Sequence, residues 1–248
     1  MSGITGPMVP QRIGRDGRGL SSATMSDQPI QALLLVLMGY LVGSLPMGVI
    51  VARLTGGVDP RTVGSGRTGG TNALRAMGPR RALVVGLADV AKGAIPILVA
   101  NAVGAAPGVA ALTGLAAVFG AWRSVFLGFS GGRGVATSVG GMLAISIPVV
   151  LITAPVFFGV IYVTRFVSLG SLLGTAAGAI VSMVFVVLGW LDAAWLLFTL
   201  GAVAIVWVAH RDNIQRLLAG TERRIGQSHA APTDVSADDA ASPAAPPR

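Results

Sequence analysis

Long apolar segments alternate with short polar segments along most of the chain. The apolar segments run over about residues 30–54, 82–103, 108–127, 135–147, 149–163, 169–190 and 193–209. Several of them approach the roughly 20 apolar residues that an α-helix needs to cross a bilayer. The pattern predicts an all-α membrane protein, a polytopic bundle of about seven transmembrane helices, several of them short or kinked.

Prolines predict where these helices bend. Pro46 falls inside the first apolar segment, where it should kink the helix while the Ser44 hydroxyl binds the freed backbone groups. Pro148 should separate the fourth segment from the fifth, and one long kinked helix is the alternative.

The two ends of the chain lack apolar periodicity. Residues 1–29 and 226–248 are therefore predicted to be disordered extensions on either side of a transmembrane domain at 30–225. Met25 stands just ahead of the first apolar segment. The hypothesis is that translation starts at Met25 and that residues 1–24 come from a wrongly assigned upstream start site.

Composition excludes an ordinary soluble enzyme. The chain is 53% hydrophobic and only 11% charged, with a mean hydropathy of +0.75, whereas soluble domains are about one quarter charged. The net charge of +8 fits cytoplasmic loops, anionic headgroups or anionic substrates, and the chain lacks the soluble basic domain expected of nucleic-acid binding. No cysteine is present, which excludes thiol nucleophiles and disulfides.

Arginine placement predicts the orientation. Each cationic segment follows an odd-numbered apolar segment, at residues 53–81, 123–133, 165 and 211–224. Because positive loops stay in the cytoplasm, the C-terminus and these segments are predicted to be cytoplasmic.

The richest polar stretch is Val63–Arg75. It holds four glycines, and glycine lets successive backbone N–H groups turn toward one anion. Ser65, Thr68 and Thr71 add hydroxyls, and Arg67 and Arg75 add guanidinium groups suited to phosphate oxygens. The stretch predicts a phosphate site at the membrane surface; an ordinary polar loop whose arginines set topology is the alternative.

Other polar residues are expected to join this site on the cytoplasmic side. The second glycine loop, Gly131-Gly132-Arg133-Gly134, repeats the same logic before a helix start. Asp89 and Lys92 share a helix face inside an apolar segment, either as a self-satisfied ion pair or with Lys92 reaching a phosphate.

The end of the last apolar segment carries His210 and Asn213. The histidine there suits acid, base or phosphate-donor chemistry, and a histidine that complements the helix dipole is the alternative. Ser168 and Ser171 begin the sixth segment, where serines also serve as caps or packing groups.

Taken together, these motifs resemble the PlsY family of glycerol-3-phosphate acyltransferases. The resemblance covers roughly residues 33–225 and is carried by Gly43-Ser44-Leu45-Pro46, Gly64-Ser65-Gly66, Gly69, Thr71-Asn72, Arg75, Asp89, Lys92-Gly93, Gly131-Gly132, Gly134–Thr137, Ser168, Ser171, His210-Arg211, Asn213 and Gly220-Thr221-Glu222. It implies a seven-helix integral membrane enzyme of the bacterial cell membrane, with no metal or cofactor and a monomeric state.

The activity that the resemblance implies is acyl transfer from acyl-phosphate to the 1-hydroxyl of sn-glycerol 3-phosphate, which yields lysophosphatidate and phosphate for phospholipid synthesis. Proton removal would be assisted by the glycerol phosphate itself. The implied catalytic residues are Ser65, His210 and Asn213. The implied substrate-binding residues are Gly64, Gly66, Arg67, Thr71, Asn72, Arg75, Lys92, Gly131, Gly132, Arg133, Ser168 and Ser171.

The chain departs from that family at four positions. Arg67 stands where the family usually has asparagine, and Ala121 stands where it usually has histidine. The dipeptide Trp122-Arg123 differs from the residues usual there, and Ser130 replaces a residue that is commonly basic. If the missing histidine is essential, the chain is a weakened homologue. The same polar loops also fit a transporter or flippase of a phosphorylated solute or lipid, or a silent membrane scaffold.

Overall fold

The computed structural model describes residues 27–226, which fold into ten α-helices and two short 3-10 helices. The α-helices are α1 (Asp27–Ser44), α2 (Met47–Leu54), α3 (Gly70–Met77), α4 (Pro79–Ala102), α5 (Pro107–Trp122), α6 (Val135–Ile145), α7 (Ile147–Thr164), α8 (Val167–Val187), α9 (Trp195–Ala209) and α10 (Arg211–Leu218). The 3-10 helices are η1 (Pro60–Thr62) and η2 (Val125–Leu127). Within the described residues, no strand longer than a single bridge is formed.

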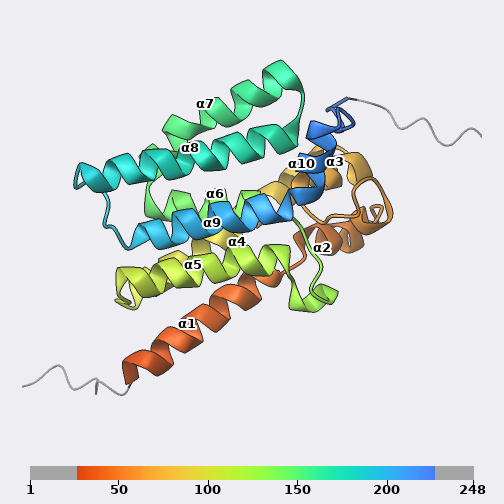
Figure 1. Cartoon of the computed structure of the whole chain (residues 1–248). Helices are drawn as coiled ribbons and strands as arrows, with labels where there is room; N and C mark the ends of the chain where they lie inside the picture. The colour runs from red at the N-terminus through yellow and green to blue at the C-terminus, as the bar shows by residue number, and fades with distance from the viewer. Residues whose placement is uncertain (1–26, 227–248) are drawn as a thin grey trace, which may run out of the picture.

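The apolar helices form one bundle in which α4 to α9 run alternately in opposite directions (Figure 1). Helices α4, α7 and α8 are each long and apolar enough to cross a membrane, and the bent pairs α1–α2 and α9–α10 raise this number to five. Helices α5 and α6 are shorter apolar helices. The predicted all-α membrane bundle with short and kinked helices is therefore confirmed.

The break at Pro46 lies between α1 and α2, whose axes differ by 48°. Lys92 Nζ of α4 donates to the Leu45 carbonyl at 3.0 Å, and Ser124 Oγ donates to the Ser44 carbonyl at 2.6 Å. The Ser44 hydroxyl itself is buried without a hydrogen-bond partner among the described residues. The expectation that Ser44 would satisfy the break was wrong, because side chains from distant segments do so.

Helices α6 and α7 are separate, so the alternative of one kinked helix was wrong. Ser146 between them has the extended dihedrals φ −157° and ψ 100°. Pro148 lies in the first turn of α7, where its missing N–H would have had no partner within the helix.

Small residues let the helices approach closely. A Cβ on Gly93 of α4 would overlap the Thr137 carbonyl of α6, and one on Gly140 of α6 would overlap the Val90 carbonyl of α4. Helix packing in a membrane depends on such close approach, because water does not drive the helices together. Helices α4 and α6 are thus tightly paired; α5 packs against α4, and α9 packs against α5 and α8.

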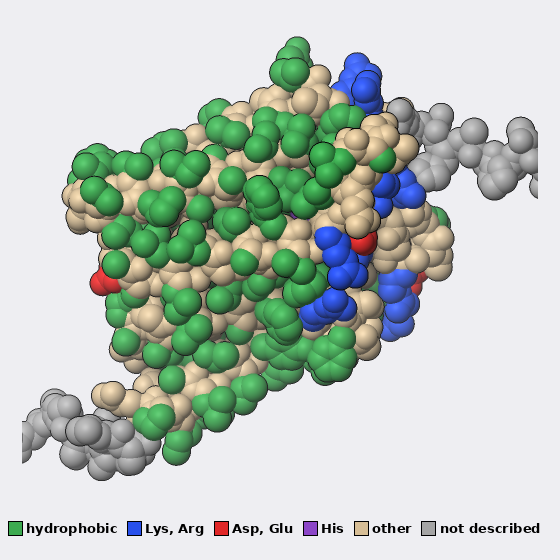
Figure 2. All heavy atoms as spheres, in the orientation of Figure 1, with side chains coloured by type: hydrophobic (Ala, Val, Ile, Leu, Met, Phe, Trp, Pro, Cys, Tyr) green, Lys and Arg blue, Asp and Glu red, His purple; other side chains and the backbone are tan. Residues whose placement is uncertain are grey.

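The short helices α2, α3 and α10 lie together at one end of the bundle (Figure 1). Arginine side chains are concentrated at that end in the view of Figure 2. The predicted gathering of the cationic segments on one side is thus observed, and α3 is an element that the hydropathy pattern missed. Helix α1 begins at Asp27, and the rest of the predicted N-terminal extension, Met25 included, lies outside the described residues, as does nearly all of the C-terminal one.

Candidate active site

A cavity of about 540 Å³ opens at the polar end and extends into the bundle. Its wall includes most of the predicted site residues: Ser65, Arg67, Thr71, Asn72, Arg75, Lys92, Gly132, Arg133, Ser168, Ser171, His210 and Asn213. The remaining three, Gly64, Gly66 and Gly131, belong to the two glycine loops and do not line the cavity. The structure therefore brings the chemistry-bearing segments of the sequence to one place.

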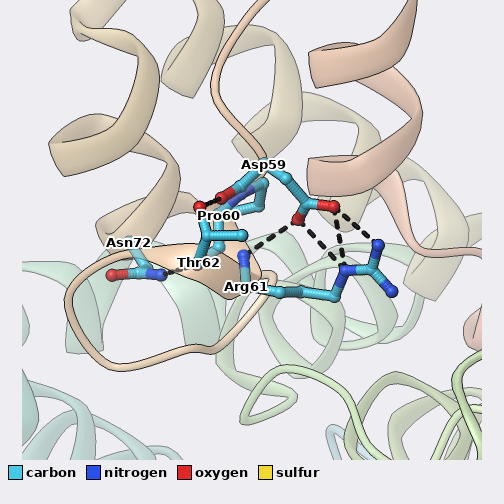
Figure 3. Close-up of polar contacts among 5 residues, drawn as sticks. All are labelled: Asp59, Pro60, Arg61, Thr62 and Asn72. Atoms are coloured by element: carbon cyan, nitrogen blue, oxygen red, sulfur yellow. Dashed lines mark hydrogen bonds and ion pairs between the residues drawn. The ribbon is translucent and has the colours of Figure 1, made fainter.

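The first glycine loop is organised by the buried amide of Asn72. Its Oδ1 accepts the Ser65 N–H at 3.1 Å, and its Nδ2 donates to the carbonyl groups of Pro60, Val63 and Arg67 at 2.6, 3.1 and 2.9 Å. Figure 3 shows the amide beside Pro60, in the turn that the Asp59–Arg61 ion pair closes. Asn72 therefore shapes the loop and is not free to act as a substrate ligand.

Glycine is required at position 64 for two reasons. Its φ is +59°, in the left-handed region, and a Cβ there would collide with the Asn72 side chain. The hydroxyl of Ser65, the next residue, lines the cavity and has no hydrogen-bond partner within residues 27–226. Thr68 and Thr71 of the same stretch also line the cavity, and their hydroxyls likewise have no hydrogen-bond partner among the described residues.

The N-terminal residues of two helices lie in the cavity wall. Helix α3 starts after Gly69 and α6 starts after Gly134, and neither has a side-chain cap. The two glycine loops touch, since a Cβ on Gly132 would lie 3.7 Å from the Gly69 nitrogen. Uncapped helix N-termini favour anions, because their N–H groups carry partial positive charge.

The polar end of the cavity carries an excess of positive charge. Its wall holds the cations Arg67, Arg75, Lys92, Arg133, Arg216 and Arg223 against the anions Asp89 and Glu222. Burial, followed by repulsion from Arg67, lowers the pKa of Arg133 to about 10, and its Nε is buried without a partner among the described residues. Such an orphaned guanidinium is poised to bind an anionic ligand.

His210 lies at the junction of α9 and α10, where the chain bends by 60°. Its ring is 2% exposed, and Nδ1 lies 2.8 Å from the Val206 carbonyl. That contact assigns the proton to Nδ1 and leaves Nε2 as an acceptor. Burial lowers the pKa of His210 to about 4, so the imidazole is neutral at physiological pH.

Glu222 is a site residue to which the sequence reasoning gave no role. Its Oε1 accepts from Ser168 Oγ at 2.9 Å and from Asn213 Nδ2 at 2.6 Å, and its Oε2 accepts from Arg216 Nε at 2.8 Å. Burial acts to raise the pKa of Glu222, but these three hydrogen bonds outweigh it and the net pKa is lowered. The charged carboxylate therefore fixes side chains from α8 and α10 in one arrangement.

Lys92 is largely committed to structure. Its Nζ lies 2.8 Å from Asp89 Oδ1 and also donates to the Leu45 carbonyl. Both side chains of the pair are buried and line the cavity. The geometry matches the expected ion pair, and it adds a bond across to the α1–α2 break.

The four departures from the family pattern lie at different distances from the cavity. Ala121 and Arg67 both line it, and the Gly132 N–H donates to the Ala121 carbonyl at 2.9 Å. Arg123 and Ser130 do not line it: the Arg123 guanidinium stacks over Trp122, and the Ser130 hydroxyl donates to the Leu127 carbonyl. Within residues 27–226, no cluster of three acidic or histidine side chains is placed to hold a metal ion.

Comparison with known proteins agrees with this arrangement. The family model "Glycerol-3-phosphate acyltransferase" matches residues 33–220. Curated glycerol-3-phosphate acyltransferases from a Synechococcus species and from Thermus thermophilus are 48% and 46% identical, over 80% and 79% of this chain and 96% of each relative.

Solved structures give the same result. The crystal structure of PlsY, an integral membrane glycerol 3-phosphate acyltransferase, in its glycerol 3-phosphate form superposes with a TM-score of 0.72 at 40% identity, covering 79% of this chain and 96% of PlsY. Its lysophosphatidic acid form superposes with a TM-score of 0.71 at 38% identity and the same coverage. The chain therefore belongs to the glycerol-3-phosphate acyltransferase family and is an integral membrane protein of the PlsY type.

Proposed function

We propose that this protein transfers an acyl group from acyl-phosphate to the 1-hydroxyl of sn-glycerol 3-phosphate, releasing lysophosphatidate and inorganic phosphate. The observation that carries the proposal is one cavity that combines a cationic end with an apolar arm. Relatives solved in glycerol 3-phosphate and lysophosphatidic acid forms support the acceptor and the product.

The charge of the cavity supports two phosphate groups at its polar end. Its wall has four more cationic than anionic side chains, with His210 neutral. A phosphomonoester carries a charge of about −1.5 to −2 near neutral pH, so two such groups bring about −3 to −4. Acyl-phosphate and glycerol 3-phosphate together would therefore nearly neutralise the site.

Two unused acceptors beside these cations suit the glycerol hydroxyls. Asn213 Oδ1 is buried and has no partner among the described residues, and the Nδ1 contact of His210 leaves Nε2 as an acceptor. Both residues line the cavity. A buried unpaired acceptor costs about 1–3 kcal/mol, which a substrate hydroxyl relieves by donating to it. The site thus favours a ligand with both phosphate and hydroxyl groups.

The reaction needs no covalent enzyme intermediate, because acyl-phosphate is already an activated anhydride. The 1-hydroxyl oxygen bonds to the acyl carbon, the bond from that carbon to the phosphate oxygen breaks, and the hydroxyl proton passes to a substrate phosphate. The loop N–H groups, the Ser65 hydroxyl and the arginines stabilise the charge that develops on the carbonyl and leaving phosphate. The polar end, with the C-terminus, faces the bacterial cytoplasm, in keeping with its arginines.

The test incubates the purified protein in phospholipid vesicles with labelled glycerol 3-phosphate and one acyl donor at a time. Lysophosphatidate should form with acyl-phosphate and not with acyl-coenzyme A or acyl carrier protein. Product with a thioester donor alone would overturn the choice of donor. Absence of product with every donor, together with counterflow of glycerol 3-phosphate across the vesicle, would favour a transporter instead.

A further inference from the structure

The cavity extends from its cationic end into an apolar arm between α6, α7, α8 and α9. Apolar or small residues line this arm: Met142, Val150, Ala154, Phe157, Gly174, Gly178, Phe198, Ala202 and Val203. Because the arm is continuous with the phosphate-binding end, a ligand that has a phosphate in one part can place an apolar tail in the other.

Phe198 lies at the deep end of this arm. On α9 the cavity wall runs from His210 back to Phe198, and at a rise of about 1.5 Å per residue the two are roughly 18 Å apart. One leaflet of a bilayer has a hydrocarbon thickness of roughly 15 Å, half of the full core. The arm is therefore about as long as the tail of a membrane lipid.

The Phe198 ring is held rigidly where it stands. It is 1% exposed and belongs to a core cluster with Ile97, Val118, Met142 and Val149, among others. The ring occupies space that glycines leave open, since a Cβ on Gly141 would overlap it and one on Gly114 would lie 3.1 Å from Cδ2. A tail that reaches this ring cannot push it aside without disrupting the centre of the bundle.

The arm is open to lipid near its polar half and closed at depth. The wall residues Leu83 and Leu87 of α4 and Phe158 of α7 are 63%, 62% and 65% exposed. At the deep end, Phe198 and Met142 are buried and Val150 and Gly178 are half-buried. A tail can therefore enter sideways from the membrane, while its end meets a closed wall.

We propose that Phe198 sets the longest acyl chain that this enzyme accepts at full rate. The inference rests on the proposed function, because it takes the tail of the acyl-phosphate as the occupant of the arm. Because the tail enters from the membrane, each methylene inside the arm exchanges contact with lipid for contact with the closely packed wall. Methylenes beyond the depth of Phe198 gain nothing and must bend out toward lipid.

The test measures kcat/KM for a series of acyl-phosphates whose chains increase by two methylenes at a time. Phe198→Ala should move the optimum to longer chains by about two methylenes or more, because it removes the end wall. Gly178→Leu should shorten the arm, since a Cβ there meets no atom within 4 Å and the added side chain can enter the cavity. It should lower kcat/KM for the longest chains about tenfold, because those chains overlap the added side chain, while the shortest chains keep theirs.

Matched controls separate this effect from general disturbance. Gly159→Leu on α7 also adds a side chain where a Cβ meets nothing within 4 Å, but position 159 does not line the cavity. Phe185→Ala removes a ring from the same core cluster away from the cavity wall. Both controls should keep the wild-type chain-length profile.

The outcomes are distinct. An active wild type whose profile is unchanged in Gly178→Leu and in folded Phe198→Ala would overturn the inference and leave the proposed function standing. If the controls shift the profile as much as the cavity variants, the inference also fails. Wild-type protein that is inactive with every acyl-phosphate would overturn the proposed function, and the inference with it.

Discussion

Asn213 Nδ2 donates to Glu222 Oε1 over 2.6 Å, and this bond fixes the orientation of the Asn213 amide. The same carboxylate oxygen accepts the Ser168 hydroxyl, so α8 and α10 are joined through Glu222. With Nδ2 committed, Asn213 Oδ1 is the atom left without a partner among the described residues. Under the proposed function, Glu222 is a positioning residue: it orients Asn213 so that one acceptor is left for a substrate hydroxyl.

Glu222→Gln should weaken acceptor binding more than it slows turnover. The amide keeps one oxygen but loses the charge that holds Arg216, and its NH₂ group cannot accept. We expect KM for glycerol 3-phosphate to rise about tenfold, the loss of roughly one charge-assisted hydrogen bond. Asp192→Asn is the control, since Asp192 lies between α8 and α9, does not line the cavity, and accepts the Ala194 N–H. Equal KM values in wild type and Glu222→Gln would contradict the positioning role.

Ser65→Ala and His210→Ala should each lower kcat about tenfold or more without unfolding the protein, because both side chains face the proposed centre of charge development. Ser130→Ala is a matched control, since this exposed serine immediately precedes the second glycine loop and its hydroxyl donates to the Leu127 carbonyl. Steady-state rates with size-exclusion profiles check the result. Unchanged rates in both cavity variants would refute the site.

Arg133→Gln should raise KM for the phosphate substrates about tenfold or more, whereas Arg133→Lys should recover much of the loss. Its Nε is buried and the guanidinium has no carboxylate partner within residues 27–226, so its charge is available to a ligand. Lysine keeps the charge but not the planar fork. Arg123→Gln, which changes a guanidinium that stacks on Trp122 outside the cavity, should leave KM unchanged. Similar losses in the glutamine and lysine variants would show that shape, and not charge, is what matters.

Lys92→Met should destabilise the fold by about 3–5 kcal/mol, because it leaves Asp89 buried without its partner. The double variant Asp89→Leu with Lys92→Met should recover most of that loss, since no unpaired charge remains. Thermal unfolding of the detergent-purified proteins measures both. If the double variant is no more stable than Lys92→Met, the bond from Lys92 to the Leu45 carbonyl, and not the ion pair, is the larger contribution.

The hydropathy pattern predicted the bundle because each crossing is a local property of about 20 residues. It missed α3, whose eight residues are amphipathic and follow a glycine loop. Repeated glycine and arginine predicted the site loops, because the backbone conformation and charge of such loops are set locally. These features required no knowledge of how the helices pack.

The remaining parts of the site depend on contacts between distant residues. The carbonyl that Lys92 binds is 47 residues away, and the hydroxyl that Glu222 binds is 54 residues away. Glu222 reaches its partners because the chain bends by 60° after α9 and then returns to the turn between α7 and α8, where the Ile225 N–H donates to the Arg165 carbonyl. An acidic residue beyond the last apolar segment carries no local sign of that return.

His210 should make the protein less stable as the pH falls. Its folded pKa is about 4, against an ordinary value of 6.5, because burial disfavours the charged ring. Between those two pH values the unfolded chain binds a proton that the folded protein does not. The contribution of His210 to the free energy of unfolding is therefore fully present above pH 6.5 and is lost as the pH falls to 4, by about 3 kcal/mol in all. Thermal unfolding from pH 8 to pH 4.5 measures this loss, with His210→Gln as the comparison because glutamine does not titrate. Both proteins retain Glu222, whose pKa is lowered from its ordinary 4.5, so its effect on stability is common to both. The difference between the wild-type and His210→Gln stability curves therefore reports the histidine alone. Parallel curves over the whole range would show that His210 protonates as readily in the folded protein as in water.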